Sequence, residues 1–181
     1  MDERVSVVIP AYDEAGAIAV TLRRVIEFLG DRAARAEIVV VDDGSGDGTA
    51  AAAEQAGVPG VRVVRLGQNA GKGAAARAGV AVTHGEVVVL TDADGEYLYN
   101  DAAPYIAAVE RGADIVLASR VHPLSSWTCP ECVGGYRDSR RRMGRVFNAL
   151  VRAVVPSRLR DTQTGLKVIG FAVRVCGDGL R

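Results

Sequence analysis

Short apolar runs alternate with longer alanine-rich segments along most of the chain. The runs are rich in Val and Ile and do not alternate strictly with polar residues, a pattern typical of strands buried on both faces of a parallel sheet. We therefore predict five strands, which cover Val5–Ile9, Ile38–Val41, Val61–Leu66, Glu86–Leu90 and Asp114–Ala118.

The segments between these runs have the length and composition of helices. We predict helices over Ala15–Leu29, Gly48–Ala56, Gly71–Thr83 and Asp101–Arg111. Because strands and helices alternate, the connections should be right-handed crossovers, and the fold class should be a three-layer α/β/α sandwich with a mostly parallel central sheet. Ligands of such sheets bind beyond the carboxyl ends of the strands, so the loops that follow the strands are where chemistry is expected.

Composition sets limits on this interpretation. The 181 residues suit one α/β domain, and with 49% hydrophobic but only 5% aromatic residues the core should be aliphatic. A net charge of zero gives no reason to expect a nucleic-acid partner. Residues 137–160, however, hold eight arginines and a single acid, Asp138. This segment is either the solvated face of a helix or a surface for an anionic partner.

Several features bear on the compartment. Three cysteines are too few for a disulfide framework, and the amino terminus enters a strand without a signal-like segment. No apolar run approaches the ~20 residues that span a bilayer. The sequence therefore predicts a cytoplasmic protein whose membrane contact is peripheral.

The strongest local signal is Asp92-Ala93-Asp94-Gly95-Glu96, directly after the fourth predicted strand. Residues i and i+2 of an extended chain face the same side, so Asp92 and Asp94 should repel each other unless a cation lies near them. Mg²⁺ and Mn²⁺ combine carboxylates with substrate phosphates, so this run suits a metal–diphosphate complex. Gly95 permits a turn that would bring Glu96 to the same ion. A polar turn or helix cap is the alternative.

Three further polar clusters follow the first three predicted strands. Pro10–Glu14 places an aromatic residue beside two acids, and Asp42–Ser45 would accept hydrogen bonds from a base or a ribose. Asn69–Gly73 places glycines and a lysine at a helix start, which favours an anion, although a solvent-exposed lysine is the alternative. Neither glycine-containing run matches a dinucleotide fingerprint or a phosphate-binding P-loop.

Taken together, the four clusters resemble the inverting family-two glycosyltransferases of GT-A fold, most closely those that transfer sugars to polyprenyl (dolichyl) phosphates. The resemblance runs from about Val5 to Lys167 and includes Ala118-Ser119-Arg120 and the run from Arg160 to Lys167. It implies a GT-A domain over residues 1–167, followed by an atypical and truncated tail over residues 168–181 that leaves turnover in question. A nucleotidyltransferase is disfavoured because Pro10–Glu14 replaces the expected glycine-rich loop.

The resemblance also implies roles for individual residues. It implies that Mg²⁺ or Mn²⁺ is held by Asp92, Asp94 and Glu96, and that Arg120 approaches the donor diphosphate or the acceptor phosphate. The candidate catalytic residues are Asp94, Arg120 and Asp161, and the candidate ligands of the acceptor phosphate are Arg120, Arg137 and Arg141. The resemblance places in the nucleotide-sugar pocket Pro10, Ala11, Tyr12, Glu14, Asp43, Gly71, Lys72, Asp92 and Ala93.

The implied reaction moves glucose or mannose from UDP-glucose or GDP-mannose to a polyprenyl phosphate at the cytoplasmic face of a membrane. A phosphate is largely ionised near neutral pH and needs no strong base. A sugar hydroxyl acceptor would need one, for which Asp161 is the candidate. A non-catalytic nucleotide-binding domain is the other alternative, and the sequence leaves homo-oligomer formation open.

The segment Val121–Ser139 is expected to form a long loop and Arg140–Val155 an amphipathic helix. The loop contains Cys129 and Cys132 at the spacing of half a zinc site, but four ligands are needed and ordinary loop cysteines are the favoured interpretation.

Overall fold

The computed structural model describes residues 4–95, 98, 101–119 and 164–170. The chain divides into one unit formed by residues 1–117 and 165–181 and a second unit formed by residues 118–164. Of the second unit, only residues 118, 119 and 164 are described, and all elements named below belong to the first unit.

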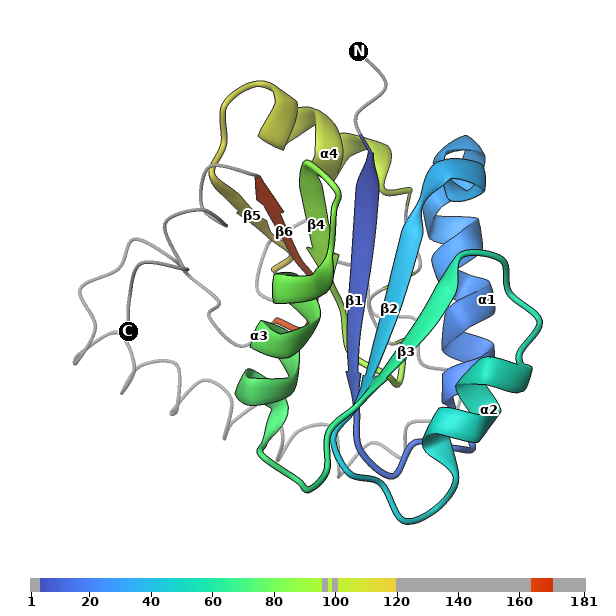
Figure 1. The fold of residues 1–181 in the computed structure, drawn as a ribbon. Helices are drawn as coiled ribbons and strands as arrows, with labels where there is room; N and C mark the ends of the chain where they lie inside the picture. The colour runs from blue at the N-terminus through green and yellow to red at the C-terminus, as the bar shows by residue number, and fades with distance from the viewer. Residues whose placement is uncertain (1–3, 96–97, 99–100, 120–163, 171–181) are drawn as a thin grey trace, which may run out of the picture. The chain divides into compact units, whose positions relative to one another are not determined.

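A six-stranded sheet with the order β3-β2-β1-β4-β6-β5 forms the centre of the first unit (Figure 1). β1 pairs in parallel with β2 and β4, and β2 pairs in parallel with β3, whereas β6 runs antiparallel to both β4 and β5. The sheet is therefore mostly parallel, as predicted. The strands are β1 (Val5–Ala11), β2 (Glu37–Asp42), β3 (Val61–Arg65), β4 (Val87–Leu90), β5 (Ile115–Leu117) and β6 (Lys167–Gly170).

The strand β6 is absent from the sequence prediction. The predicted domain boundary, Lys167, is the first residue of β6. The other three residues of β6 lie in the segment that is expected from the sequence to be an atypical tail. The central sheet therefore continues through Gly170. Residues 171–181 lie outside the described residues.

Helices cover both faces of the sheet and make the predicted three-layer arrangement. α3 lies on one face, whereas α1 and α2 lie on the other (Figure 1). α4 packs on the same side as α1, since the rings of Phe28 and Tyr105 lie 6.2 Å apart. The helices are α1 (Ile18–Leu29), α2 (Thr49–Gln55), α3 (Lys72–Val82) and α4 (Ala103–Glu110), and a short 3-10 helix, η1 (Gly30–Arg35), follows α1.

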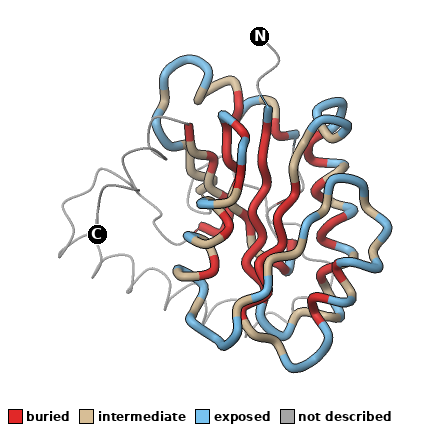
Figure 2. Tube along the Cα trace, viewed as in Figure 1, coloured by how far each residue is buried: buried red, intermediate tan, exposed pale blue. Residues whose placement is uncertain are grey.

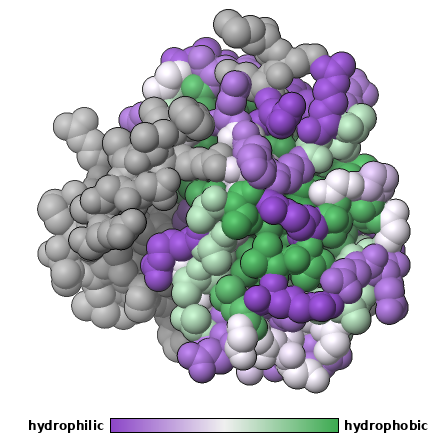
Figure 3. All heavy atoms as spheres, in the orientation of Figure 1, coloured by the Kyte–Doolittle hydropathy of each residue, from purple (hydrophilic) through white to green (hydrophobic). Residues whose placement is uncertain are grey.

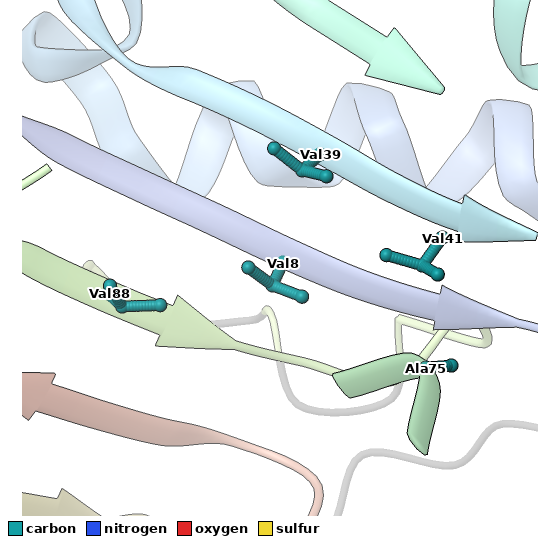
Figure 4. Close-up of a cluster of buried hydrophobic side chains, with 5 residues drawn as sticks. All are labelled: Val8, Val39, Val41, Ala75 and Val88. Atoms are coloured by element: carbon teal, nitrogen blue, oxygen red, sulfur yellow. The ribbon is translucent and has the colours of Figure 1, made fainter. Parts of the chain in front are cut away.

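The core is aliphatic, as the composition predicted. Figure 2 shows buried backbone running along β1, β2 and β4, and every residue of β1 is buried. On the α3 face, Val8, Val39, Val41, Ala75 and Val88 form one buried cluster (Figure 4). These strands can be apolar on both faces because both faces are covered by helices.

Small residues bring α3 close to the sheet. A Cβ added at Gly79 would lie 2.4 Å from Val8 Cγ1 and 2.9 Å from Val41 Cγ2, so only glycine fits there without a shift of the helix. The partly buried side chains of Val64, Leu66 and Val82 extend the same cluster beside α3, where apolar residues gather in Figure 3. Within the described part of the chain, no helix is both long enough and apolar enough to cross a bilayer.

Candidate functional site

The loops that follow the carboxyl ends of the parallel strands meet at one edge of the sheet. The loops after β1, β2 and β3 can be seen at the lower edge of Figure 1. The parallel register of β1 with β2 and β4 brings these loops to the same edge. We refer to it below as the carboxyl edge. The four polar clusters found in the sequence all follow strands that end there.

The loop after β1 is fixed to the loop after β2 through backbone groups. Asp13, which has a positive φ of 53°, donates its N–H to Ser45 Oγ over 3.0 Å and accepts from the Gly46 N–H over 3.0 Å. The N–H groups of the next two residues, Glu14 and Ala15, are bound by side chains of the β2–α2 segment. The backbone that carries Tyr12 and Glu14 is therefore held by the neighbouring loop.

Asp43 anchors a third loop. Its carboxylate accepts from the N–H groups of Ala70, over 2.9 Å, and Gly71, over 2.8 Å, and the residue is only 2% exposed. Gly44, with a φ of 76°, lets the two loops approach, since a Cβ there would lie 2.7 Å from the backbone of Gln68. Both Asp43 oxygens thus bind backbone at the start of α3, which gives this residue a structural role in addition to its predicted place in the nucleotide pocket.

The segment after β4 forms an acidic turn, which we define as Asp92–Gly95. The Gly95 N–H donates to the Asp92 carbonyl over 3.3 Å, and Gly95 has a φ of 65°. The predicted turn at Gly95 is therefore present. Asp92 Oδ1 accepts from Lys72 Nζ over 2.6 Å, so the first carboxylate of the turn and the first residue of α3 are in direct contact.

The charges at this edge act on Glu14. Burial raises the pKa of Glu14, and the negative charges of Asp94, Asp47 and Asp92 raise it further. Carboxylates that follow β2 and β4 therefore act on the carboxylate of Glu14, which follows β1. Such a site favours the binding of a cation.

We tested whether these side chains suit a divalent ion. Among residues 4–95, 98, 101–119 and 164–170, no group of three His, Cys, Asp or Glu side chains converges as a complete ligand set. Mg²⁺ and Mn²⁺ need only one or two carboxylates when substrate phosphates complete the coordination. The acidic turn offers two such carboxylates, Asp92 and Asp94, and both contribute to the raised pKa of Glu14 after the larger effect of burial.

The other predicted pocket residues are placed as follows. Pro10 and Ala11 are buried at the end of β1, Tyr12 is 48% exposed, and the Lys72 side chain is 62% exposed. Several predicted site residues lie outside the described residues, so their roles remain predictions: Glu96, Arg120, Arg137, Arg141 and Asp161. The same is true of Cys129 and Cys132.

Sequence reasoning missed two side chains that shape this edge. Thr21 of α1 donates to the Ala93 carbonyl in the acidic turn, and Asp47 accepts from the Ala15 N–H. Hydrogen bonds to the Thr49 hydroxyl and the Ala15 backbone lower the pKa of Asp47, so it remains ionised. A buried threonine within an apolar helix face was the available signal for Thr21, but nothing local indicated its partner 72 residues away.

The mostly parallel sheet and an acidic turn at its carboxyl edge define the class of GT-A glycosyltransferases. Comparison with known families agrees, because the model for glycosyl transferase family 2 matches residues 6–131. The chain belongs to this family.

Curated relatives carry names of polyprenyl-phosphate sugar transferases. The chain is 32% identical to an undecaprenyl-phosphate 4-deoxy-4-formamido-L-arabinose transferase of Edwardsiella ictaluri, over 87% of this chain and 46% of the relative. It is 30% identical to the human dolichyl-phosphate beta-glucosyltransferase, over 92% of this chain and 54% of the relative. The chain thus spans about half the length of the curated relatives it matches.

Solved structures show the same fold. Glucosyl-3-phosphoglycerate synthase from Mycobacterium tuberculosis, in complex with Mn²⁺, UDP and glucosyl-3-phosphoglycerate, superposes with a TM-score of 0.66 at 22% identity. The match covers 94% of this chain and 58% of that one. A mannosyltransferase from Pyrobaculum calidifontis in complex with GDP-Man and Mn²⁺ gives a TM-score of 0.59 at 24% identity, over 93% of this chain and 44% of that one.

Proposed function

We propose that this chain is a metal-dependent inverting glycosyltransferase that moves glucose or mannose from UDP-glucose or GDP-mannose to a polyprenyl phosphate. The observation that carries the proposal is the acidic turn, in which Asp92 contacts Lys72 and beside which burial, and then the charges of Asp94, Asp47 and Asp92, raise the pKa of Glu14. A metal–diphosphate complex would match both the carboxylates and the lysine.

The donor would be held by residues of the loops that follow β1, β3 and β4. Asp92 and Asp94 would hold Mg²⁺ or Mn²⁺, which would neutralise the charge that grows on the leaving diphosphate. The ammonium group of Lys72, mostly exposed and 2.6 Å from Asp92, is within reach of a phosphate bound beside that carboxylate. The exposed ring of Tyr12 lies on the fixed backbone after β1 and would flank the base.

The proposed reaction is a single displacement. An oxygen of the acceptor phosphate forms a bond to the anomeric carbon while the bond from that carbon to the diphosphate breaks, and the nucleoside diphosphate leaves. The acceptor oxygen is already ionised near neutral pH, because the second pKa of a phosphate monoester is about 6. The chain's task would then be to orient both phosphates, which we assign to Lys72 and, from sequence, to Arg120, Arg137 and Arg141.

The names of the relatives support the acceptor more firmly than the sugar. The undecaprenyl-phosphate and dolichyl-phosphate enzymes differ in the sugar that their names state, but share a polyprenyl phosphate. An acceptor of this kind resides in a membrane, so we propose that the chain acts peripherally at the cytoplasmic face, with the arginines of residues 137–160 toward lipid phosphates.

A transfer assay tests the proposal. The purified chain is incubated with radiolabelled UDP-glucose or GDP-mannose, a short-chain polyprenyl phosphate and Mn²⁺. The proposal predicts a lipid-linked sugar that is absent with excess chelator and absent with Asp92→Asn. Transfer to a saccharide hydroxyl instead would show that the acceptor is a saccharide and not a polyprenyl phosphate, and Asp161 would then be the candidate base. Donor binding without any transfer would indicate that the chain is a non-catalytic nucleotide-binding domain.

A further inference from the structure

The acidic turn is held in place by α1, which carries none of the predicted site residues. Thr21 lies on the buried side of that helix and is 1% exposed, so its hydroxyl needs a partner within the protein. A threonine inside a helix usually bonds back to a carbonyl of its own preceding turn. Here the Thr21 hydroxyl instead donates to the carbonyl of Ala93 over 2.5 Å.

The bonded carbonyl belongs to the peptide that joins Ala93 to Asp94, between the two carboxylates of the turn. Because a peptide unit is planar, fixing this carbonyl also fixes the direction of the Asp94 N–H and the position of the Asp94 Cα within the same plane. Ala93 itself is 5% exposed, so its orientation is further limited by packing.

Gly95 also brings the turn close to Thr21 and to Arg24 of α1. A Cβ added at Gly95 would lie 3.0 Å from Thr21 Oγ1 and 3.4 Å from Arg24 Cδ, so the turn lies directly against this helix. On the other side of the turn, Asp92 is bonded to Lys72 at the start of α3. The turn is thus held between helices from the two opposite faces of the sheet.

We propose that Thr21 is a positioning residue that sets the relative orientation of the Asp92 and Asp94 carboxylates for a metal–diphosphate ligand. The inference rests on the function proposed above, and it assigns to α1 a direct part in that site. Groups that orient metal ligands typically change metal affinity about 10- to 100-fold when they are removed.

The test compares three variants of the full chain. Thr21→Val removes the hydroxyl at nearly constant shape, and Thr21→Ser keeps it. Thr83→Val is the matched control, since Thr83 is equally buried and its hydroxyl donates to the Val80 carbonyl at the end of α3, close to the opposite edge of the sheet. Mn²⁺ affinity is measured by calorimetry in the presence of saturating UDP or GDP, and amide hydrogen exchange of residues 92–95 is measured without metal.

We expect Thr21→Val to weaken Mn²⁺ binding about tenfold or more and to speed exchange in the acidic turn. Thr21→Ser should restore most of the affinity, and Thr83→Val should leave it unchanged. Unchanged affinity and exchange in Thr21→Val would overturn the inference, as would an equal loss of affinity in Thr83→Val. If the wild-type chain binds neither nucleotide with metal, the proposed function fails, and exchange in the turn alone then decides whether Thr21 orients it.

Discussion

The two edges of the sheet use carboxylates in opposite ways. At the amino edge, where the parallel strands begin, Glu37 accepts from the Ser6 hydroxyl over 2.7 Å, the His84 N–H over 2.9 Å and the Arg62 guanidinium over 3.0 Å. Burial raises the pKa of Glu37, but these hydrogen bonds and the charge of Arg62 outweigh it, so the pKa is lowered. At the carboxyl edge, burial and neighbouring carboxylates raise the pKa of Glu14.

The difference separates a carboxylate that stabilises the fold from carboxylates that we propose to be ligand-binding. Glu37 ties β1, β2, β3 and the segment before β4 together, so its charge is neutralised within the protein. The charges around Glu14 are arranged so that an added cation would relieve their repulsion. Perturbed carboxylates are a feature of functional sites, and Glu14, whose pKa is raised by burial and by neighbouring carboxylates, lies where ligands of parallel sheets bind.

The largest expected effect is on stability at the amino edge. Glu37→Ala removes a carboxylate that accepts several hydrogen bonds and leaves the hydroxyl of Ser6, which is fully buried, without that acceptor. We expect a loss of about 3 kcal/mol in the free energy of unfolding, measured by urea denaturation, because bonds to charged groups contribute more than neutral ones. Nucleotide binding by the remaining folded protein should be unchanged. Weakened binding would contradict the claim that carboxylates at the amino edge stabilise the fold without taking part in ligand binding.

At the carboxyl edge, Asp94→Asn should weaken ligand binding without destabilising the fold, which is the opposite of what is expected for Glu37→Ala. Removing one of the charges that raise the pKa of Glu14 should leave the free energy of unfolding unchanged or slightly increased. Metal-dependent nucleotide binding should weaken at least tenfold, which corresponds to about 1.4 kcal/mol. Calorimetry and urea denaturation of the same preparation check both expectations. A large loss of stability would instead mean that Asp94 is structural, like Glu37.

The pH dependence of stability should differ between the edges. Since folding lowers the pKa of Glu37, its contribution is present above the unfolded value, near 4.5, and is lost as the pH falls through the folded value. The difference in unfolding free energy between wild type and Glu37→Gln should therefore disappear in acid. The contribution of Glu14 to stability has the opposite pH dependence, because folding raises its pKa. In metal-free buffer, the free energy of unfolding of Glu14→Gln should therefore increase relative to wild type as the pH rises through the raised pKa. Parallel profiles for the two variants would contradict the comparison.

The smallest effect is expected from Glu54→Ala, which serves as the control for the amino edge. Glu54 and Arg65 form an ion pair of 2.9 Å, but both side chains are more than half exposed. Exposed pairs contribute little, so the free energy of unfolding should change by about 0.5 kcal/mol or less. A change comparable to that of Glu37→Ala would show that burial and multiple donors do not explain the role of Glu37.

Much of the fold could be predicted from the sequence because its signals are local. The apolar runs predicted all five parallel strands of the sheet, and the helices between them begin and end within three residues of the expected positions. β6 was missed because its four residues form a strand only by pairing with β4 and β5, which lie far away in the chain. A short run has no local signal that separates such a strand from a loop.

The candidate site also combines features that the sequence predicts with contacts that only the structure reveals. The rule that parallel strands bring their following loops to one edge places Lys72 and Asp92 at the same edge, and in the structure Lys72 Nζ lies 2.6 Å from Asp92 Oδ1. The bond from Thr21 to Ala93 and those from Ala70 and Gly71 to Asp43 join segments that are 27 to 72 residues apart. No pattern along the chain predicts such tertiary contacts, so the anchoring of the acidic turn could be seen only in three dimensions.

The most direct test of the central claim is calorimetric titration of UDP and of GDP, each with and without Mn²⁺, into the wild-type chain and an Asp92→Asn, Asp94→Asn double variant. Asp31→Asn, an exposed change in η1, is the matched control. The account predicts that one nucleotide binds only with Mn²⁺, that the double variant loses this binding, and that Asp31→Asn retains it. Metal-independent binding, or equal binding by the double variant while it remains folded, would contradict the claim that the acidic turn holds a metal–diphosphate ligand.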